Sequence, residues 1–287
     1  MSVIYGNLNV DEKYSGLLEP NLYYPSFFID GKTFTSKYET GPAGGIFVHK
    51  LATSTATPGT PGRDFSDEAT SDTLVPIVLN NNYQKSKKIY GVQASAVDID
   101  LANEQLSIAT QEVAEGMQIS GLACLVSEKG ATASTTSALT TANIKKVVLA
   151  DRKVIVSNKG RADVLAMSPA AFATLLEATG AEFTPERNEF ANANGQMGKW
   201  LGFDVYEVPA LAETNGVYYN SAGNKTTASF GSVDYIMYNH EALSIIPNFD
   251  VARIVDSENF NGAKAQVELN VGFKVTSPVQ VLAKTHS

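Results

Sequence analysis

The residues that could do chemistry in this chain are few and widely spaced. Cys124 is the only cysteine, and the three histidines, His49, His240 and His286, are far apart in sequence. Zinc sites usually show closely spaced pairs such as HExxH or CxxC, and neither pair occurs here. The sequence therefore predicts no zinc site of ordinary spacing, no disulfide framework and no bound cofactor.

The two motifs that come nearest to a catalytic or binding signature both fail. The run GQMGKW at residues 195–200 has GxxGK instead of the phosphate-loop pattern GxxxxGK[ST], and Trp200 stands where the hydroxyl residue belongs. No GxSxG nucleophile elbow is present, and Ser168, followed by Pro169, fits a helix N-cap better than a nucleophile. We therefore expect that the chain is not an enzyme.

Composition limits the remaining classes of function. The chain has 287 residues, of which 44% are hydrophobic, and a net charge of −8. This length supports one large domain or two ordinary ones, and the acidic balance disfavours a protein that wraps nucleic acid over its whole surface. The N-terminus lacks a basic start followed by an apolar run, and no stretch of about 18 apolar residues occurs. We expect no secretory signal, no membrane contact, and a product that is assembled inside a cell.

The elements that would position any site begin with a long helix. Apolar residues recur at spacings of three and four in the order Ile99, Ala102, Leu106, Ala109, Val113 and Met117. The pattern predicts a helix over 98–127, about 40 Å long at 1.5 Å per residue. A second helix is expected from about Thr141, and a strand, a helix from Pro169 and another strand are expected between 162 and 209.

Near the C-terminus the pattern changes to a period of two. Residues 264–275 alternate between apolar and polar types, which is typical of a strand with one buried face. Asn261-Gly262 is a strong hairpin signal because both residues tolerate positive φ. The sequence therefore predicts a long two-stranded ribbon that turns at Asn261-Gly262, with Val251 to Val255 as the partner strand.

Two segments look unsuited to closing a core. Residues 52–72 are rich in Thr, Ser, Pro and Gly, and they lie between two apolar runs; loops longer than about 12–15 residues are usually functional or disordered. This stretch is either a surface insertion or a hairpin that reaches over a neighbouring subunit, and Pro76 must lie at an edge or a bulge. The aromatic N-terminal arm, which includes Tyr23 and Tyr24, packs either on its own domain or on a neighbour.

This order of elements resembles the major capsid proteins of tailed bacteriophages, which share the Hong Kong 97 fold. The resemblance covers nearly the whole chain. It rests on Ser168-Pro169 between a strand and a helix, on LGFDV at 201–205 followed by PAL at 209–211, and on FNG at 260–262 followed by the alternating strand. It implies an α+β capsid fold. The implied parts are an N-terminal arm (1–30), an extended loop (31–92, hairpin about 44–90), a peripheral domain (93–139 and 249–276, spine helix 98–127) and an axial domain (140–248 and 277–287).

The resemblance also implies a function and partners. Pentamers and hexamers of the chain would close into an icosahedral shell around double-stranded DNA, without sequence-specific binding, in a virion assembled in the host cytoplasm. A separate scaffolding protein, a portal and decoration proteins would be partners. An encapsulin-like compartment and an α+β enzyme with an unrecognised site remain as alternatives.

The resemblance directs attention to residues that would contact neighbouring subunits. The expected inter-subunit contacts are Tyr23, Tyr24, Arg63, Asp64, Phe65 and Asn261. Some capsid proteins of this fold link their subunits covalently through a loop lysine and a ribbon asparagine. Lys50 and Asn261 are chemically possible candidates for such a link.

Overall fold

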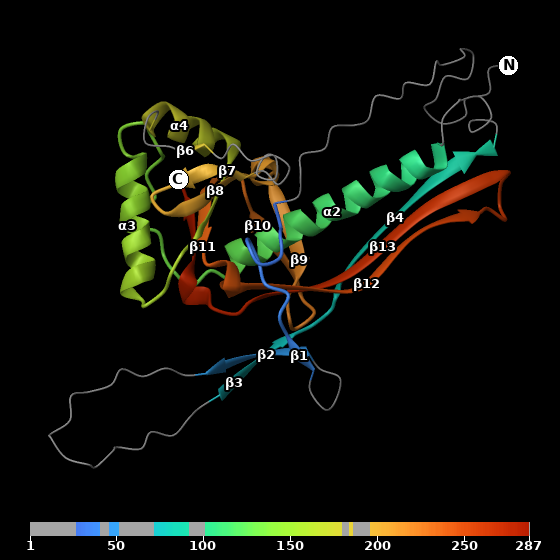
Figure 1. Cartoon of the computed structure of the whole chain (residues 1–287), viewed down its shortest axis with the longest axis horizontal. Coiled ribbons are helices and arrows are strands. Elements are labelled where there is room, and N and C mark those ends of the chain that lie inside the picture. Colours follow the sequence, from blue (N-terminus) through green and yellow to red (C-terminus); the bar gives the residue numbers. More distant parts are fainter. Residues whose placement is uncertain are drawn as a thin grey trace.

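The structure is a computed structural model that describes residues 27–40, 46–51, 72–91, 101–179, 184–185 and 196–286. It combines helices and sheets, as the predicted α+β class requires. Figure 1 shows a layered body at one end, a long helix and a long sheet that extend together from it, and a hairpin that projects in a third direction. Only the body is packed on all sides.

The long helix α2 (Leu101–Ser127) lies along a three-stranded antiparallel sheet. The strands, in the order β12-β13-β4, are β12 (Leu243–Asp256), β13 (Gly262–Val275) and β4 (Asn81–Tyr90). In β13 the predicted alternation holds, because Ala265, Val267 and Val271 are buried while Gln266 and Glu268 between them are partly exposed. The helix therefore covers one face of the sheet, and the other face carries polar side chains.

The predicted ribbon is present, but its details differ from the prediction. Strand β12 ends at Asp256, and residues 257–261 form the connection, so Asn261-Gly262 is not a two-residue turn. The partner strand is also much longer than the predicted Val251 to Val255. Gly262 has φ +152°, and a Cβ there would lie 2.0 Å from the carbonyl oxygen of Ile89. Glycine is needed here because β4 approaches closely, and not because the hairpin turns here.

Strand β4 is the element that sequence reasoning missed. Residues 81–90 were expected to belong to the projecting hairpin, and they pair instead with β13 along its length, from Asn81 opposite Val271 to Tyr90 opposite Gly262. Both ends of the strand are buried: Ile89 packs against Leu101 of α2 and Ala265 of β13, and Asn81 is hydrogen-bonded to Tyr219 of the segment 215–219. Most residues of this strand are polar, so its sequence lacks the apolar alternation that would have predicted a strand.

A six-stranded sheet with the order β14-β11-β5-β8-β7-β6 forms the body. Its strands are β5 (Val164–Met167), β6 (Thr184–Pro185), β7 (Gln196–Trp200), β8 (Phe203–Glu207), β11 (Val233–Tyr238) and β14 (Val281–Thr285). Strands β5 and β8 are parallel, and the other pairs are antiparallel. Three short helical turns, η1 (Pro209–Ala212), η2 (His240–Ala242) and η3 (Pro278–Gln280), connect these elements.

Different layers cover the two faces of this sheet. Helices α3 (Ile144–Ser157) and α4 (Pro169–Thr179) pack on one face. The C-terminal end of α2 and the hairpin of β9 (Asn215–Tyr219) and β10 (Lys225–Ser229) pack on the other. Helix α4 begins where the sequence predicted, with the Ala171 N–H 3.4 Å from Ser168 Oγ. Helix α3 begins three residues later than the expected Thr141.

Two aromatic residues near the end of the N-terminal arm, Phe27 and Phe28, anchor the arm to the body of its own subunit. The Phe27 N–H donates to Gln118 Oε1 at 3.0 Å, and the Phe27 ring packs edge-on against Tyr206. A Cβ at Gly121 would lie 2.5 Å from the ring of Phe28, so α2 needs a glycine there. At Phe27 and Phe28 the arm therefore packs on its own domain.

The projecting hairpin has its own small sheet, in the order β1-β2-β3. Its strands are β1 (Glu39–Thr40), β2 (Ile46–Leu51) and β3 (Asp72–Ile77). Pro76 pairs with Phe47 in β3, which is an edge strand, as the sequence predicted. Residues 52–71 connect β2 to β3 and lie outside the described residues.

Candidate assembly surfaces

The described residues form no candidate metal centre, and the thiol of Cys124 is buried. Among them, no three His, Cys, Asp or Glu side chains come together in a way that could hold a metal ion. The Cys124 side chain is fully buried, and burial raises the pKa of its thiol well above the usual value, so it stays protonated and unreactive. Among the described helices, none combines the length and the apolar character that a bilayer crossing requires. The described residues also include exposed apolar side chains on the hairpin sheet, the long sheet, α3 and α4, which are the candidate contact surfaces.

A lysine joins the hairpin to the end of the long sheet. Lys50 Nζ, near the end of β2, donates to the carbonyl oxygen of Thr276 at 3.1 Å and to Ser277 Oγ at 3.0 Å. Lys50 was a candidate for a covalent link with Asn261. Within one subunit the two residues lie at opposite ends of β13, which at about 3.3 Å per residue spans about 45 Å. Any reaction between them would have to join different subunits.

Two asparagines hold the other side of the hairpin base. Asn80 Nδ2 donates to the carbonyl oxygen of Asn220 at 2.7 Å. Asn81 donates to the Tyr219 carbonyl oxygen at 3.1 Å and accepts the Tyr219 N–H at 2.8 Å. The chain is therefore tied to the β9–β10 hairpin directly after β3. Because strand β2 and the residues directly after β3 are both hydrogen-bonded to the body, the hairpin leaves the subunit in a defined direction.

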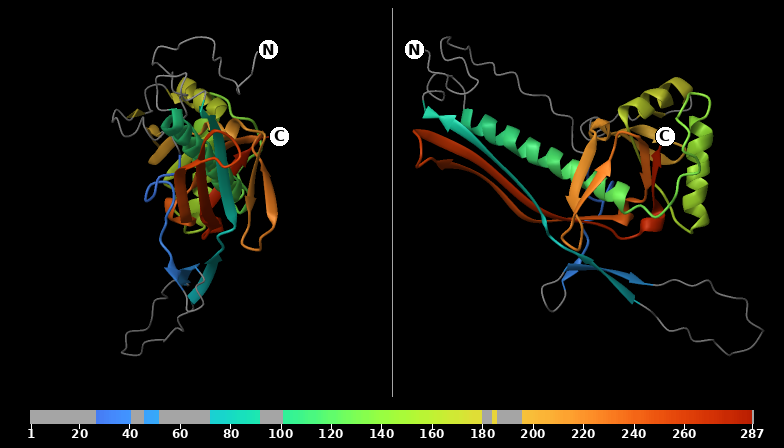
Figure 2. Two further views of the ribbon diagram at one scale, coloured as in Figure 1. Left: turned by 90° about the vertical axis from the view of Figure 1, so that its right-hand side faces the viewer. Right: turned by 180° about the vertical axis from the view of Figure 1, so that it is seen from behind.

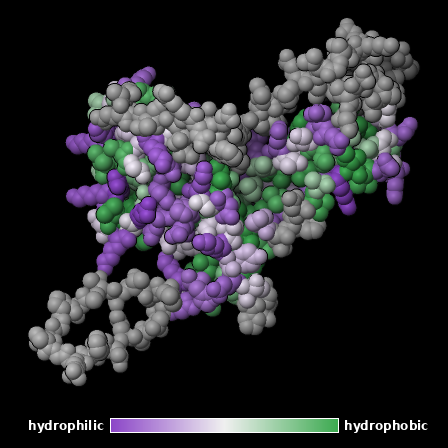
Figure 3. Space-filling model, viewed as in Figure 1, coloured by the Kyte–Doolittle hydropathy of each residue, from purple (hydrophilic) through white to green (hydrophobic). Residues whose placement is uncertain are grey.

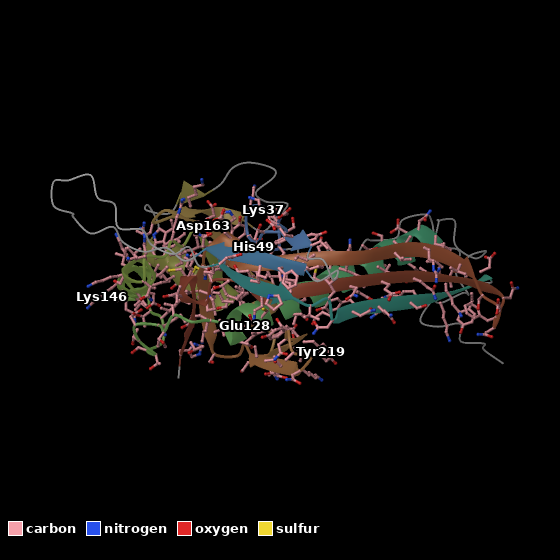
Figure 4. All side chains as sticks on the ribbon, turned by 90° about the horizontal axis from the view of Figure 1, so that it is seen from below. Lys37, His49, Glu128, Lys146, Asp163 and Tyr219 are labelled. Atoms are coloured by element: carbon pink, nitrogen blue, oxygen red, sulfur yellow. The ribbon has the colours of Figure 1, made fainter. Side chains whose placement is uncertain are left out.

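A histidine links the three strands of the hairpin sheet. His49 Nδ1 lies 2.5 Å from Asp72 Oδ2 on β3, and His49 Nε2 lies 3.1 Å from Glu39 Oε2 on β1. The hydrogen bond to Asp72 raises the pKa of His49 above its usual 6.5, and the charge of Glu39 adds to this. Figure 4 shows His49 on the strands of the hairpin. The arrangement fastens the strands most strongly when the imidazole is protonated.

The far end of the long sheet carries a pair of partly exposed aromatic rings. The ring of Phe260 lies 5.0 Å from the ring of Tyr90, and Lys88 and Lys264 have their ammonium groups 6.0 and 5.8 Å from the Phe260 centroid. Asn261 is exposed beside this group, and its carbonyl oxygen accepts the Gly91 N–H at 2.9 Å. The tip thus presents an amide, an aromatic ring and cations at the point farthest from the body.

Buried polar groups fix the segment between α2 and α3, which the sequence had shown only as low complexity. Asp151 accepts the Ser134 N–H at 2.6 Å and the Tyr235 hydroxyl at 2.7 Å. Lys284 is fully buried and donates to the carbonyl oxygen of Ser137 at 2.8 Å. These contacts join residues distant in sequence, and no local pattern could have predicted them.

Most of the predicted contact residues cannot be placed. Tyr23, Tyr24, Arg63, Asp64 and Phe65 lie outside the described residues, and only Asn261 is placed, at the exposed tip. Sequence reasoning also missed exposed apolar side chains, which lie on or next to the hairpin sheet, on β12 and on the outer sides of α3 and α4. They include Tyr38, Leu74, Leu149, Val156, Leu176 and Ile254. Helical periodicity could have marked Leu149 and Val156, which are seven residues apart on the side of α3 away from the core.

Solved structures with this arrangement are capsids. The chain aligns with the structure titled "Capsid of Ralstonia phage GP4" over 100% of its own length and 98% of the other chain, with a TM-score of 0.68 and 11% identity. The chain has the capsid fold of tailed phages. A capsid chain of bacteriophage PhiM1 matches with a TM-score of 0.67 and 14% identity, over 96% of this chain and 91% of that chain. The capsid of cyanophage P-SCSP1u matches with a TM-score of 0.63 and 12% identity, over 100% and 93%.

The predicted resemblance to phage capsid proteins is therefore confirmed at the level of the fold. No family model matches the sequence, and no curated protein matches it. The likeness lies in the three-dimensional arrangement and extends over whole chains on both sides.

Proposed function

We propose that this chain is the major capsid protein of a tailed bacteriophage and that it assembles, through pentamers and hexamers, into an icosahedral shell around double-stranded DNA. The observation that carries the proposal is the match over nearly the full length of both chains to capsid subunits.

The parts of the subunit take the roles that the resemblance implied. Residues 1–30 form the arm, 31–92 the extended loop with its hairpin, 93–139 and 249–276 the peripheral domain around α2, and 140–248 and 277–287 the axial domain. The hairpin buries little of its surface within one subunit and the long sheet is covered by α2 on one face only, so neighbours supply the remaining packing. Closed shells arise when such head-to-tail contacts repeat around rotation axes.

The shell encloses DNA without reading its sequence. A net charge of −8 attracts phosphates weakly, which suits a wall past which packaged DNA must slide. Assembly takes place in the host cytoplasm with a separate scaffolding protein and a portal, and decoration proteins bind the finished virion.

Light scattering of the purified chain over a range of concentrations and salt tests the proposal. We expect particles far larger than the 30.6 kDa chain. A single species of subunit mass under every condition would contradict it. Nucleic acid recovered from particles isolated from infected cells would distinguish a phage head from a compartment filled with protein.

A further inference from the structure

The outer side of α3 is a cationic surface on an acidic protein. The helix carries Lys145, Lys146, Arg152 and Lys153, and all four are exposed, while its one acid, Asp151, is buried and hydrogen-bonded. Figure 3 shows hydrophilic residues projecting from the edge of the molecule that α3 forms, and in Figure 4 Lys146 extends away from the body. The chain as a whole has a net charge of −8, so this concentration of cations requires an explanation.

Apolar side chains lie between these cations. Leu149 and Val156 are 41% and 55% exposed, and they are seven residues apart, so they share one stripe of the helix. Lys145 and Arg152 flank the stripe on one side, and Lys146 and Lys153 flank it on the other. A phosphate backbone would pair with the cations and leave the apolar stripe uncovered. The partner that fits is therefore a protein surface with an apolar centre and acidic neighbours.

The outer side of α4 has this chemistry. Ala170, Ala173, Leu176 and Glu177 are exposed along one side of the helix, and Leu176 is 46% exposed. The two alanines allow another helix to approach closely, and Glu177 supplies a negative charge beside Leu176. Both helices pack their inner sides on the same face of the six-stranded sheet. Their outer sides are therefore directed away from the core, and among the described residues Leu149, Val156 and Leu176 stay exposed there.

The two surfaces point in different directions. Figures 1 and 2 show α3 along one side of the body and α4 across the adjoining side. A contact between α3 of one copy and α4 of the next is therefore heterologous, and its repetition builds a ring if the rotation closes. A symmetric contact of α3 with α3 would bring two sets of cations together, which costs energy.

We infer that the outer side of α3 docks against the outer side of α4 of a second copy of this chain, with Leu149 and Val156 packing on Leu176 and with Lys146 or Lys153 pairing with Glu177. The inference rests on the proposed function and names one contact within its rings. A homopolymeric shell always presents the second copy at high concentration, which favours this occupant over a separate protein.

Disulfide trapping tests the contact. The variant with both Val156→Cys and Leu176→Cys should give, under oxidising assembly conditions, a covalent ladder up to the size of a pentamer or hexamer. A mixture of the two single variants should stop at dimers, and each single variant alone should stay uncrosslinked. Cys124 is fully buried and does not interfere. A matched control pair, Leu74→Cys with Val279→Cys, has similar exposure of 50% and 47% and should give no ladder.

Charge reversal supplies an independent readout. Lys146→Glu with Lys153→Glu should lower the yield of particles by about tenfold, which corresponds to ~1.4 kcal/mol. Lys32→Glu with Lys225→Glu makes the same change in net charge at other exposed positions and should leave the yield unchanged. Adding Glu177→Lys to the α3 variant should restore part of the yield.

The outcomes separate this inference from the proposed function. If the wild-type chain forms no particles, the proposed function fails. If particles form but the paired cysteines give no ladder, or if Val156→Cys alone forms dimers, only the α3–α4 contact is wrong. If the α3 charge reversal leaves particle yield unchanged and abolishes binding to duplex DNA, α3 is a DNA-contacting surface and the inference is overturned.

Discussion

The two halves of α2 have the same backbone conformation and very different surroundings. Near its C-terminal end, the consecutive residues Leu122, Ala123, Cys124 and Leu125 all have no exposed surface. In the N-terminal half only one stripe is covered, by β13 and β4, and Leu106 is half-buried. The C-terminal half of the helix is part of the core of the body. The N-terminal half packs only against a single sheet.

The difference indicates which parts of the subunit fold independently and which depend on neighbours. Truncating a fully buried side chain lowers the free energy of unfolding the most, because the surrounding residues relax only partly into the cavity that is left. Truncating a half-buried side chain lowers it less. The exposed part of such a side chain is available for contact with another chain. We therefore expect the C-terminal half of α2 to control folding and the N-terminal half to respond to assembly.

The largest effect is expected for Leu122→Ala. Leu122 belongs to the main core and has no exposed surface, so the change should lower the free energy of unfolding by about 3–5 kcal/mol. Thermal or denaturant unfolding of the unassembled subunit measures it. Leu74→Ala, at a position that is 50% exposed, is the control and should stay within about 0.5 kcal/mol of wild type. Equal effects from the two substitutions would contradict the division of α2.

Leu106→Ala should have a smaller effect within the subunit. Leu106 touches two small clusters on the sheet and is half-buried, so a loss of about 1–2 kcal/mol is expected. The same unfolding measurement applies. Hydrogen exchange should also show faster opening of β4 and the N-terminal half of α2, while the body stays protected. Loss of protection in the body as well would mean that the two halves fold as one unit.

A smaller effect is expected for Glu112→Gln. Glu112 on α2 accepts from Lys87 at 2.5 Å and from Lys85 at 2.9 Å, both on β4. Burial pushes the pKa of Glu112 up, but the hydrogen bonds from Lys87 and Lys85 outweigh this and hold it below its usual 4.5. The loss should be about 0.5–1 kcal/mol near neutral pH.

The pH dependence of this ion pair follows from the direction of the shift. Because the folded-state pKa is lowered, the stabilisation is present above pH 4.5 and is lost as the pH falls through the lowered value. Unfolding of wild type and Glu112→Gln should therefore converge in acid. A constant difference between the two proteins down to low pH would show that the pair does not hold α2 on β4.

The smallest effect is local and lies within the hairpin sheet. His49 has a raised pKa because of its hydrogen bond to Asp72, so the pair fastens the hairpin below pH 6.5 and the stabilisation is lost as the pH rises through the raised value. Hydrogen exchange of residues 46–51, corrected for its intrinsic pH dependence, should show less protection in alkaline solution. In His49→Gln the protection of residues 46–51 should no longer change with pH. If it still falls in alkaline solution, the imidazole is not the cause.

The sequence predicted the parts of this fold that have strong periodicity. The helix expected over 98–127 is described from Leu101 to Ser127, and the alternating strand at 264–275 lies within β13. Strand β4 was missed because Asn, Gln, Lys and Ser occupy most of its positions, which gives no apolar periodicity. Its pairing with β13 determines that it is a strand. The predicted position of the turn, at Asn261-Gly262, was wrong. The glycine at 262 is required by the close approach of β4, and local sequence does not encode that contact.

The candidate contact surfaces were less predictable than the fold. Asn261 was identified from a turn motif, and it lies at the exposed tip. The anchors of the hairpin, Lys50 on Ser277 and Asn81 on Tyr219, join residues more than 100 positions apart. Contacts of this range depend on how whole layers pack, and residue spacing alone does not reveal them.

Cryo-electron microscopy of the purified full-length chain, under conditions that favour assembly, tests the central claim most directly. We predict closed icosahedral particles whose subunits are arranged in pentamers and hexamers, with the long sheet and α2 recognisable in each subunit. Discrete small particles that hold a fixed low number of subunits at every concentration would contradict the proposal that this chain builds a shell.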